Sequence, residues 1–278
     1  MIPATTLLVP VERPPHAATA LPVARELARL KGATVSLIHV GVEPLEPGEL
    51  LDHIGLSPED ARGLVIDQRA GFAADAVVRE AGARHAELIV MCTPARPDRL
   101  LHPFGSVAGD VLRTAPCPVV LVPRDRGQGP WALHRLVLPH DGTPTSAAAI
   151  APTVDLASRA GAELVVLHVS TPGSKRPSEP GTFVTPRYLD QPQHGWPLWT
   201  REFLDRVRSF AHPTIIEKIR LVVAHGEADA AILEFAERNA TDLIALAWRG
   251  GVAPERARTM RRVICEASCP VIVFRVQV

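Results

Sequence analysis

Short apolar runs alternate with segments of helical periodicity along the first half of the chain. Residues 6–11 (TLLVPV) and 34–40 (TVSLIHV) have the length and composition of strands, and between them apolar side chains recur at helical spacing over 17–30. Gly32 is expected to end that helix, because glycine is favoured just past a helix C-terminus. Strands that alternate with helices of this length predict an α/β fold with a parallel sheet and right-handed crossovers.

The alternation then continues. The pattern predicts a third strand over 64–67, a helix over 72–83 and a fourth strand over 88–91. A further helix over 105–113 and a fifth strand over 119–122 complete the unit. The last two strands are apolar throughout, which is typical of parallel strands that are covered on both faces.

The second half of the chain repeats the first. The matching segments are 32–40 with 161–169 at an offset of 129, 87–89 with 242–244 at 155, and 117–119 with 269–271 at 152. Matches at constant offsets indicate a tandem duplication. We therefore expect α/β domains at 1–123 and 135–278, joined by a polar, glycine-rich linker at 124–134. The change of offset from 129 to 155 places an insertion at about 170–212 in the second domain.

Composition and charge narrow the class of protein. The chain has 278 residues, of which 46% are hydrophobic and 22% charged, as is ordinary for a globular protein. Its formal net charge is zero, which argues against nucleic acid or a membrane surface as a partner. No apolar stretch has the length of a membrane span and no secretory signal pattern is found, so we expect a cytoplasmic protein.

Motifs for catalysis or metal binding are missing from the sequence. No Gly-x-Ser-x-Gly, Walker loop or His-Glu-x-x-His is found, so hydrolase, NTPase and zinc protease functions lack a starting motif. The four cysteines form no Cys-x-x-Cys pair, and buried free thiols are expected. We assign no catalytic residue and no metal ligand.

Several segments together resemble the universal stress protein family. They are Leu-x-His-Val at the end of the second strand, Leu-Ile-Val-Met in the fourth, and Gly-Ser-Val-Ala followed by Val-Leu-Arg-x-Ala-Pro-Cys-Pro-Val before the fifth. The resemblance covers nearly the whole chain, twice. It implies doubly wound five-stranded parallel sheets of strand order 3-2-1-4-5, a stress-response role, and pairing of two domains through their last strands. A tandem chain would form that pair internally, with 271–274 covering the apolar edge 119–122.

The resemblance also implies a nucleotide site after the fourth strand, because ATP-binding members of the family carry Gly-x2-Gly-x9-Gly-Ser/Thr there. In this chain the four positions are Cys92, Ala95, Gly105 and Ser106. Glycines let the backbone approach phosphate oxygens, and a helix N-terminus stabilises their charge. The first two glycines are replaced by residues whose Cβ obstructs that approach.

Other implied site positions are divided between the two halves. Glu12 stands for the aspartate of the family's first strand, and Val40 closes the second strand. In the second half the corresponding residues are Asp141 and Val169, and Gly250 stands at the second glycine position. Each half therefore keeps a different part of the ATP site.

The start of the last helix differs most. Aligned from the Cys-Pro segment, the Gly-Ser pair becomes Ala257-Arg258 in the second half, within a cluster of five arginines between 249 and 262. We expect these arginines to pair with Asp and Glu on a solvated helix face, rather than to bind phosphate.

The insertion gathers aromatic residues in a chain that is only 4% aromatic, namely Phe183, Tyr188, Trp196, Trp199 and Phe203. Aromatic residues beside proline and glycine in a long loop are typical of docking surfaces. We expect them to cover the neighbouring half, a second copy of the chain in a homodimer, or another protein partner. The alternative is a lid over a small ligand.

Taken together, these features predict a regulatory or protective stress-response module rather than an enzyme, with a weakened or lost nucleotide site. The rival hypothesis is a switch that binds ATP or another adenine nucleotide with Mg and hydrolyses it slowly. That switch would use Glu12, Gly105 and Ser106.

Overall fold

The computed structural model describes residues 5–12, 16–93, 106–170, 201, 203–249 and 254–276. By their internal contacts the residues fall into two compact units. The first comprises Met1–Ala132 with Ile264–Val273, and the second comprises Leu133–Val263 with Phe274–Val278. Within the described ranges, no helix combines the length and apolar character that crossing a membrane requires.

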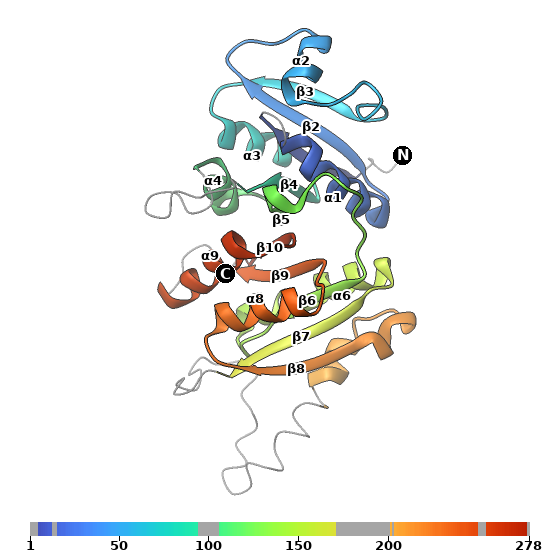
Figure 1. The fold of residues 1–278 in the computed structure, drawn as a ribbon, viewed down its shortest axis with the longest axis vertical. Helices are drawn as coiled ribbons and strands as arrows, with labels where there is room; N and C mark the ends of the chain where they lie inside the picture. The colour runs from blue at the N-terminus through green and yellow to red at the C-terminus, as the bar shows by residue number, and fades with distance from the viewer. Residues whose placement is uncertain are drawn as a thin grey trace, which may run out of the picture. The chain divides into compact units, whose positions relative to one another are not determined.

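Strands and helices alternate along the first unit (Figure 1). Its strands are β1 (Thr6–Val11), β2 (Thr34–Gly41), β3 (Val65–Ala70), β4 (Leu88–Cys92) and β5 (Val119–Val122). Its helices are α1 (His16–Lys31), α2 (Pro47–Ile54), α3 (Ala73–Ala83), α4 (Ser106–Thr114) and the short 3-10 helix η1 (Arg124–Arg126).

The sheet of the first unit is parallel from β3 to β5, in the order β3-β2-β1-β4-β5. This order and the α/β class confirm the predicted fold. The central strands form the core, and Leu7, Ile89 and Val120 are fully buried. Residues Val271–Val273 pair antiparallel with β5 and belong to the same unit by their contacts.

The second unit repeats the alternation, with three parallel strand pairs that give the order β9-β6-β7-β8. Its strands are β6 (Arg135–Pro139), β7 (Glu163–Ser170), β8 (Ile219–His225) and β9 (Leu243–Trp248), and the last strand of the chain is β10 (Val271–Arg275). Its helices are α5 (Pro144–Ala147), α6 (Ile150–Ala160), a helical segment at 203–208, the 3-10 helix η2 (Pro213–Lys218), α8 (Ala228–Arg238) and α9 (Pro254–Glu266).

The duplication extends to single hydrogen bonds. His39 Nδ1 lies 3.2 Å from the carbonyl oxygen of Val11, and His168 Nδ1 lies 2.9 Å from that of His140. Both residues of the second pair lie 129 positions after those of the first. Because a carbonyl oxygen only accepts, each ring donates its Nδ1 proton and ties the second strand of its unit to the first.

Candidate functional site

The candidate residues of the first unit gather at the carboxyl edge of its sheet. Glu12 follows β1, Val40 lies in the last part of β2, and Cys92 ends β4. The strand order reverses between β1 and β4, because β2 pairs on one side of β1 and β4 on the other. In doubly wound sheets, ligands bind outside the carboxyl ends of the strands at such a switch point.

Cys92 is a poor candidate for a nucleophile. Burial raises the pKa of its thiol to about 12, against a smaller opposing effect from Arg124 and Arg126. The thiol therefore stays protonated at neutral pH, and the thiolate is the reactive form. The next residue anchors the strand end, since the Thr93 N–H donates to the Val122 carbonyl oxygen over 2.9 Å.

The loop and helix after β4 are described in part. Ser106 is the first residue of α4, whereas Ala95 and Gly105 lie outside the described residues. The helix therefore begins at the hydroxyl-bearing position that the family resemblance selects.

Two residues that pack against His39 beside this edge, His53 and Gly41, were not predicted from the sequence. The ring of His53 in α2 makes a T-shaped contact with the buried ring of His39, with the centroids 5.0 Å apart. A Cβ added to Gly41 would lie 3.2 Å from His39 Nε2. The glycine directly after the Leu-x-His-Val segment was the available signal for this tight packing.

In the second unit, Asp141 organises the turn that follows β6. Its Oδ1 accepts hydrogen bonds from the Thr143 N–H (3.0 Å), the Thr143 hydroxyl (2.7 Å) and the Ser146 hydroxyl (2.7 Å). The Thr143 hydroxyl in turn caps α5. The Asp141 carboxylate thus has a clear local structural role. Val169 is half-buried in β7, and Gly250 lies outside the described residues.

His140 was not predicted as a site residue, yet it is the most perturbed base of the second unit. Burial lowers the pKa of its imidazole to about 4, while Asp141 raises that pKa slightly and His168 lowers it. The buried ring of Phe203 lies against it, with the centroids 5.0 Å apart. Phe203 therefore packs inside its own unit, and the other four aromatic residues of the insertion lie outside the described residues.

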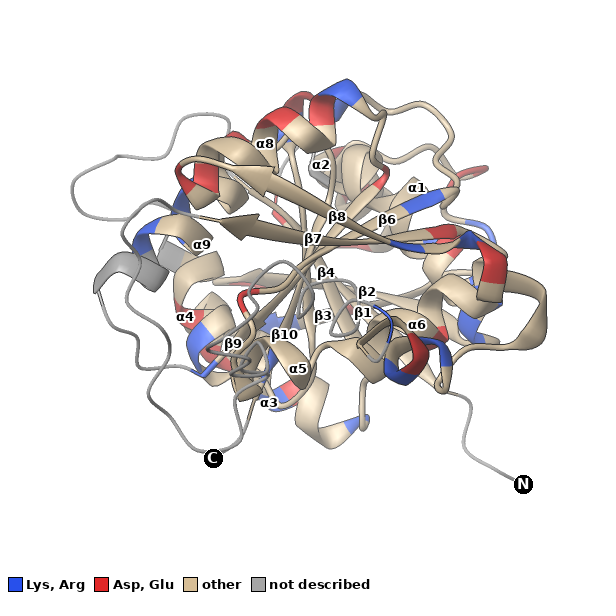
Figure 2. Ribbon diagram, turned by 90° about the horizontal axis from the view of Figure 1, so that it is seen from below, with Lys and Arg blue, Asp and Glu red and all other residues tan. Residues whose placement is uncertain are grey.

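Arginines of α9 form ion pairs with acidic residues at the start of α8. Arg258 Nη2 lies 3.3 Å from Glu227 Oε2, and Arg262 Nη1 lies 3.3 Å from Asp229 Oδ1. In Figure 2 the acidic residues of α8 are red and the arginines of α9 are blue. Asp229 is only 1% exposed, and besides Arg262 its carboxylate has Arg258 Nε at 3.8 Å and accepts a hydrogen bond from the Ala230 N–H over 2.8 Å. The expected pairing of arginines with Asp and Glu is confirmed for Arg258 and Arg262.

Fold and site together define a tandem protein of doubly wound α/β units whose candidate ligand edge lies at the carboxyl ends of parallel strands. The model of the universal stress protein family matches residues 4–123 and again 132–275. The chain therefore belongs to the universal stress protein family.

Individual relatives match this chain either over a short stretch or at low sequence identity. Universal stress protein Rv2005c of Mycobacterium tuberculosis is 36% identical over 87 residues, which span 31% of this chain and 30% of the relative. A crystal structure of the functionally unknown protein PA1789 from Pseudomonas aeruginosa PAO1 matches with a TM-score of 0.68 and 18% identity, over 98% of this chain and 92% of the other. The crystal structure of a universal stress protein from Archaeoglobus fulgidus matches with a TM-score of 0.63 and 16% identity, over 97% of this chain and 98% of the other. Structures at this identity support the fold alone.

Proposed function

We propose that this chain is a regulatory or protective stress-response module, not an enzyme, in which nucleotide binding is weakened or lost. Membership of the universal stress protein family supports the stress-response role. The observation that carries the second part is the pairing of Glu227 with Arg258, which is the fifth residue of α9 and holds the position that corresponds to Ser106.

In the second unit, the position of the phosphate-binding serine is held by Arg258. Its side chain is engaged by Glu227 and lies 3.8 Å from Asp229 Oδ2. This position lies one turn inside α9, which begins at Pro254, and the two carboxylates bring negative charge to it, which disfavours a phosphate group there because like charges repel. This arrangement supports a loss of phosphate binding in the second unit.

In the first unit, Cys92 brings a Cβ and a half-buried thiol to the place of the first glycine. A side chain there hinders the close approach of backbone N–H groups to phosphate oxygens. The Cys92 thiol stays protonated at neutral pH, so it does not act as a nucleophile there.

The test is isothermal titration of the full chain with Mg-ATP. We expect no binding tighter than about 10 μM, which corresponds to roughly −7 kcal/mol. The variant Cys92→Gly/Ala95→Gly restores both glycines and should bind at least about tenfold more tightly, a difference of about 1.4 kcal/mol. Cys117→Gly is the matched control and should behave as the parent chain does. Binding of Mg-ATP by the parent chain below about 10 μM would overturn the proposal.

A second candidate function is an adenine-nucleotide switch in the first unit. The beginning of α4 at Ser106 and the exposed position of Glu12 at the strand edge favour it. This function predicts slow release of inorganic phosphate from Mg-ATP over hours, lost in Ser106→Ala and unchanged in the control Ser57→Ala. Phosphate release at the rate of a buffer blank excludes hydrolysis by this candidate.

A further inference from the structure

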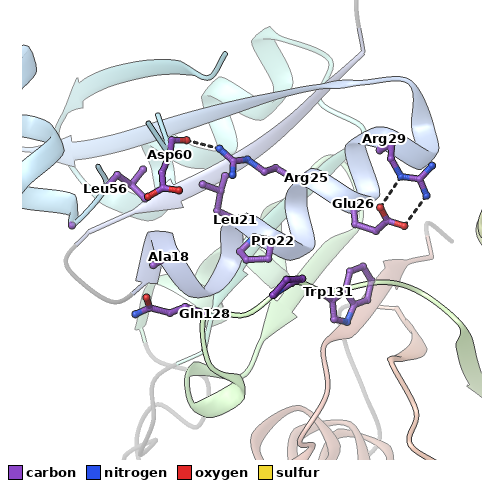
Figure 3. Close-up of a pocket in the computed structure, with 12 residues that line it drawn as sticks. Ala18, Leu21, Pro22, Arg25, Glu26, Arg29, Leu56, Asp60, Gln128 and Trp131 are labelled. Atoms are coloured by element: carbon purple, nitrogen blue, oxygen red, sulfur yellow. Dashed lines mark hydrogen bonds and ion pairs between the residues drawn. The ribbon is translucent and has the colours of Figure 1, made fainter. Parts of the chain in front are cut away.

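A groove runs along α1 in the first unit (Figure 3). Its volume is about 510 Å³, within the range of sites that hold small ligands. One wall is the turn after α2, which includes Leu56 and Asp60, and the other is the linker from Gln128 to Trp131. We call this feature the α1 groove.

The middle of the α1 groove is apolar. Leu21 is 3% exposed and Leu56 is 5% exposed, and both line it. Pro22 and Trp131 add a ring each, and Figure 3 shows Pro22 on α1 facing the linker that carries Trp131. An indole ring offers a large flat surface against which a planar apolar group can stack.

The charged side chains of the α1 groove are only partly paired with one another. Glu26 and Arg29 form a bidentate pair, with N–O distances of 2.7 and 2.8 Å, and so neutralise each other. The Asp60 carboxylate accepts a hydrogen bond from the neutral Ser57 hydroxyl over 2.6 Å and keeps its negative charge. Arg25 donates to the carbonyl oxygen of Asp60, which is a neutral group. Among the described residues, the structure gives Arg25 no carboxylate partner, so its guanidinium group can form an ion pair with a bound anion.

The second unit closes the corresponding helix face. Val154 corresponds to Arg25 at the repeat offset of 129, and Ile215 corresponds to Asp60 at the offset of 155. Both replacements are 0% exposed, and η2, which carries Ile215, contacts α6. Arg29 likewise becomes Ser158, whose hydroxyl oxygen accepts from the His212 N–H over 3.1 Å. One repeat thus buries this face under apolar side chains, and the other leaves it open with an arginine.

We propose that the α1 groove binds a small organic anion with a planar apolar body. Arg25 meets the acidic group, because a guanidinium offers several donors in one plane and recognises carboxylates and sulfonates. Pro22, Leu56 and Trp131 contact the planar body. The site is separate from the strand-end site and does not depend on the proposed function.

The test uses 8-anilinonaphthalene-1-sulfonate as the probe, in fluorescence titrations of the folded full chain. The parent chain should bind it saturably. Arg25→Gln should weaken binding about tenfold or more, because the charge is lost at nearly constant volume. Arg79→Gln removes an exposed arginine of α3 and is the matched control, with no change expected.

A neutral probe separates anion recognition from simple capture of apolar molecules. N-phenyl-1-naphthylamine lacks the sulfonate, so its binding should be weaker and equal in the parent chain and Arg25→Gln. Because Arg25 is exposed, its substitution should leave the far-ultraviolet circular dichroism unchanged. The proposal is wrong if the parent chain shows no saturable binding of the sulfonate, or if Arg25→Gln binds it as tightly as the parent chain does.

Discussion

The two units make the same hydrogen bond between their second and first strands, yet its acceptor belongs to different residues. In the first unit the acceptor is the carbonyl of Val11, and in the second it is that of His140. Backbone groups have thus been retained where side chains have changed. Gly32 and Gly161 show the same conservation of backbone, because both end the helix after the first strand with φ near +65° (65° and 64°).

Differences between the units lie at the sheet edge and on helix faces. Arg25 of the open α1 face corresponds to the buried Val154, and the Ser106 position at the start of α4 corresponds to Arg258 in α9. Side chains in the middle of the sheet are buried on both faces, so few residue types fit there. Edge and surface positions are less restricted, and there the two copies have acquired different chemistry.

The largest effect is expected from exchanging residues between the two helix faces. Val154→Arg places a charge at a fully buried position and should lower the free energy of unfolding by about 4 kcal/mol or more. The reverse exchange, Arg25→Val, changes an exposed position and should alter the free energy of unfolding by less than about 0.5 kcal/mol. Urea titrations followed by circular dichroism measure both. Similar effects of the two exchanges would contradict the assignment of one closed and one open face.

The next effect concerns pH. The pKa of His140 is lowered to about 4 by burial, from an ordinary value of 6.5. The unfolded chain therefore binds a proton more readily than the folded chain, so stability is complete above pH 6.5 and falls as the pH decreases toward 4. This group should contribute a loss of about 3 kcal/mol over that range. His140→Val, which introduces the Val11 of the first repeat, should reduce the difference between urea unfolding at pH 7 and pH 4.5. An unchanged pH dependence would show that His140 is not the group responsible.

A smaller effect is expected in the α8–α9 ion cluster. Asp229→Ala removes the buried carboxylate that faces Arg262 and should lower the free energy of unfolding by about 2 kcal/mol. This is the magnitude expected for a hydrogen bond to a charged group. Glu227→Ala removes an exposed partner of Arg258, whose side chain is 67% exposed, and should cost almost nothing. Urea unfolding of both variants provides the comparison. Equal losses of unfolding free energy would contradict a larger contribution to stability from the buried Asp229 than from the exposed Glu227.

The smallest effect should be the same in both units. Gly32→Ala and Gly161→Ala each force a side chain into a left-handed backbone conformation and should each cost about 1 kcal/mol. No heavy atom lies within 4 Å of a Cβ added at either glycine, so the cost is conformational and not steric. Unfolding free energies that differ clearly between the two variants would contradict the equivalence of the repeats.

Much of the fold could be predicted from the sequence. The range 6–11 for β1 and 119–122 for β5 matched the structure, because continuous apolar runs between turn residues are a strong signal. The third strand was predicted at 64–67 and is found at Val65–Ala70, since an edge strand with polar residues lacks that signal. The 3-10 helix η2 was missed for a similar reason. It is short, and its isoleucines become informative only when α6 lies against them.

Less of the candidate site could be predicted. Glycine spacing selected Cys92 and the start of α4, because the family resemblance fixes those positions along the chain. It could not select His140, whose role depends on the distant Phe203, or Arg25, whose partner is 35 residues away. Contacts between distant segments depend on tertiary packing, which the local pattern of residues does not contain.

The most direct measurement of the central claim is the nucleotide content of the purified full chain. The protein would be denatured after purification without added nucleotide, and the released adenine nucleotides quantified by chromatography and mass spectrometry. Our account predicts only trace amounts, far below one nucleotide per chain, because neither unit keeps the complete set of phosphate-binding positions. Release of ATP or another adenine nucleotide in stoichiometric amount would contradict it.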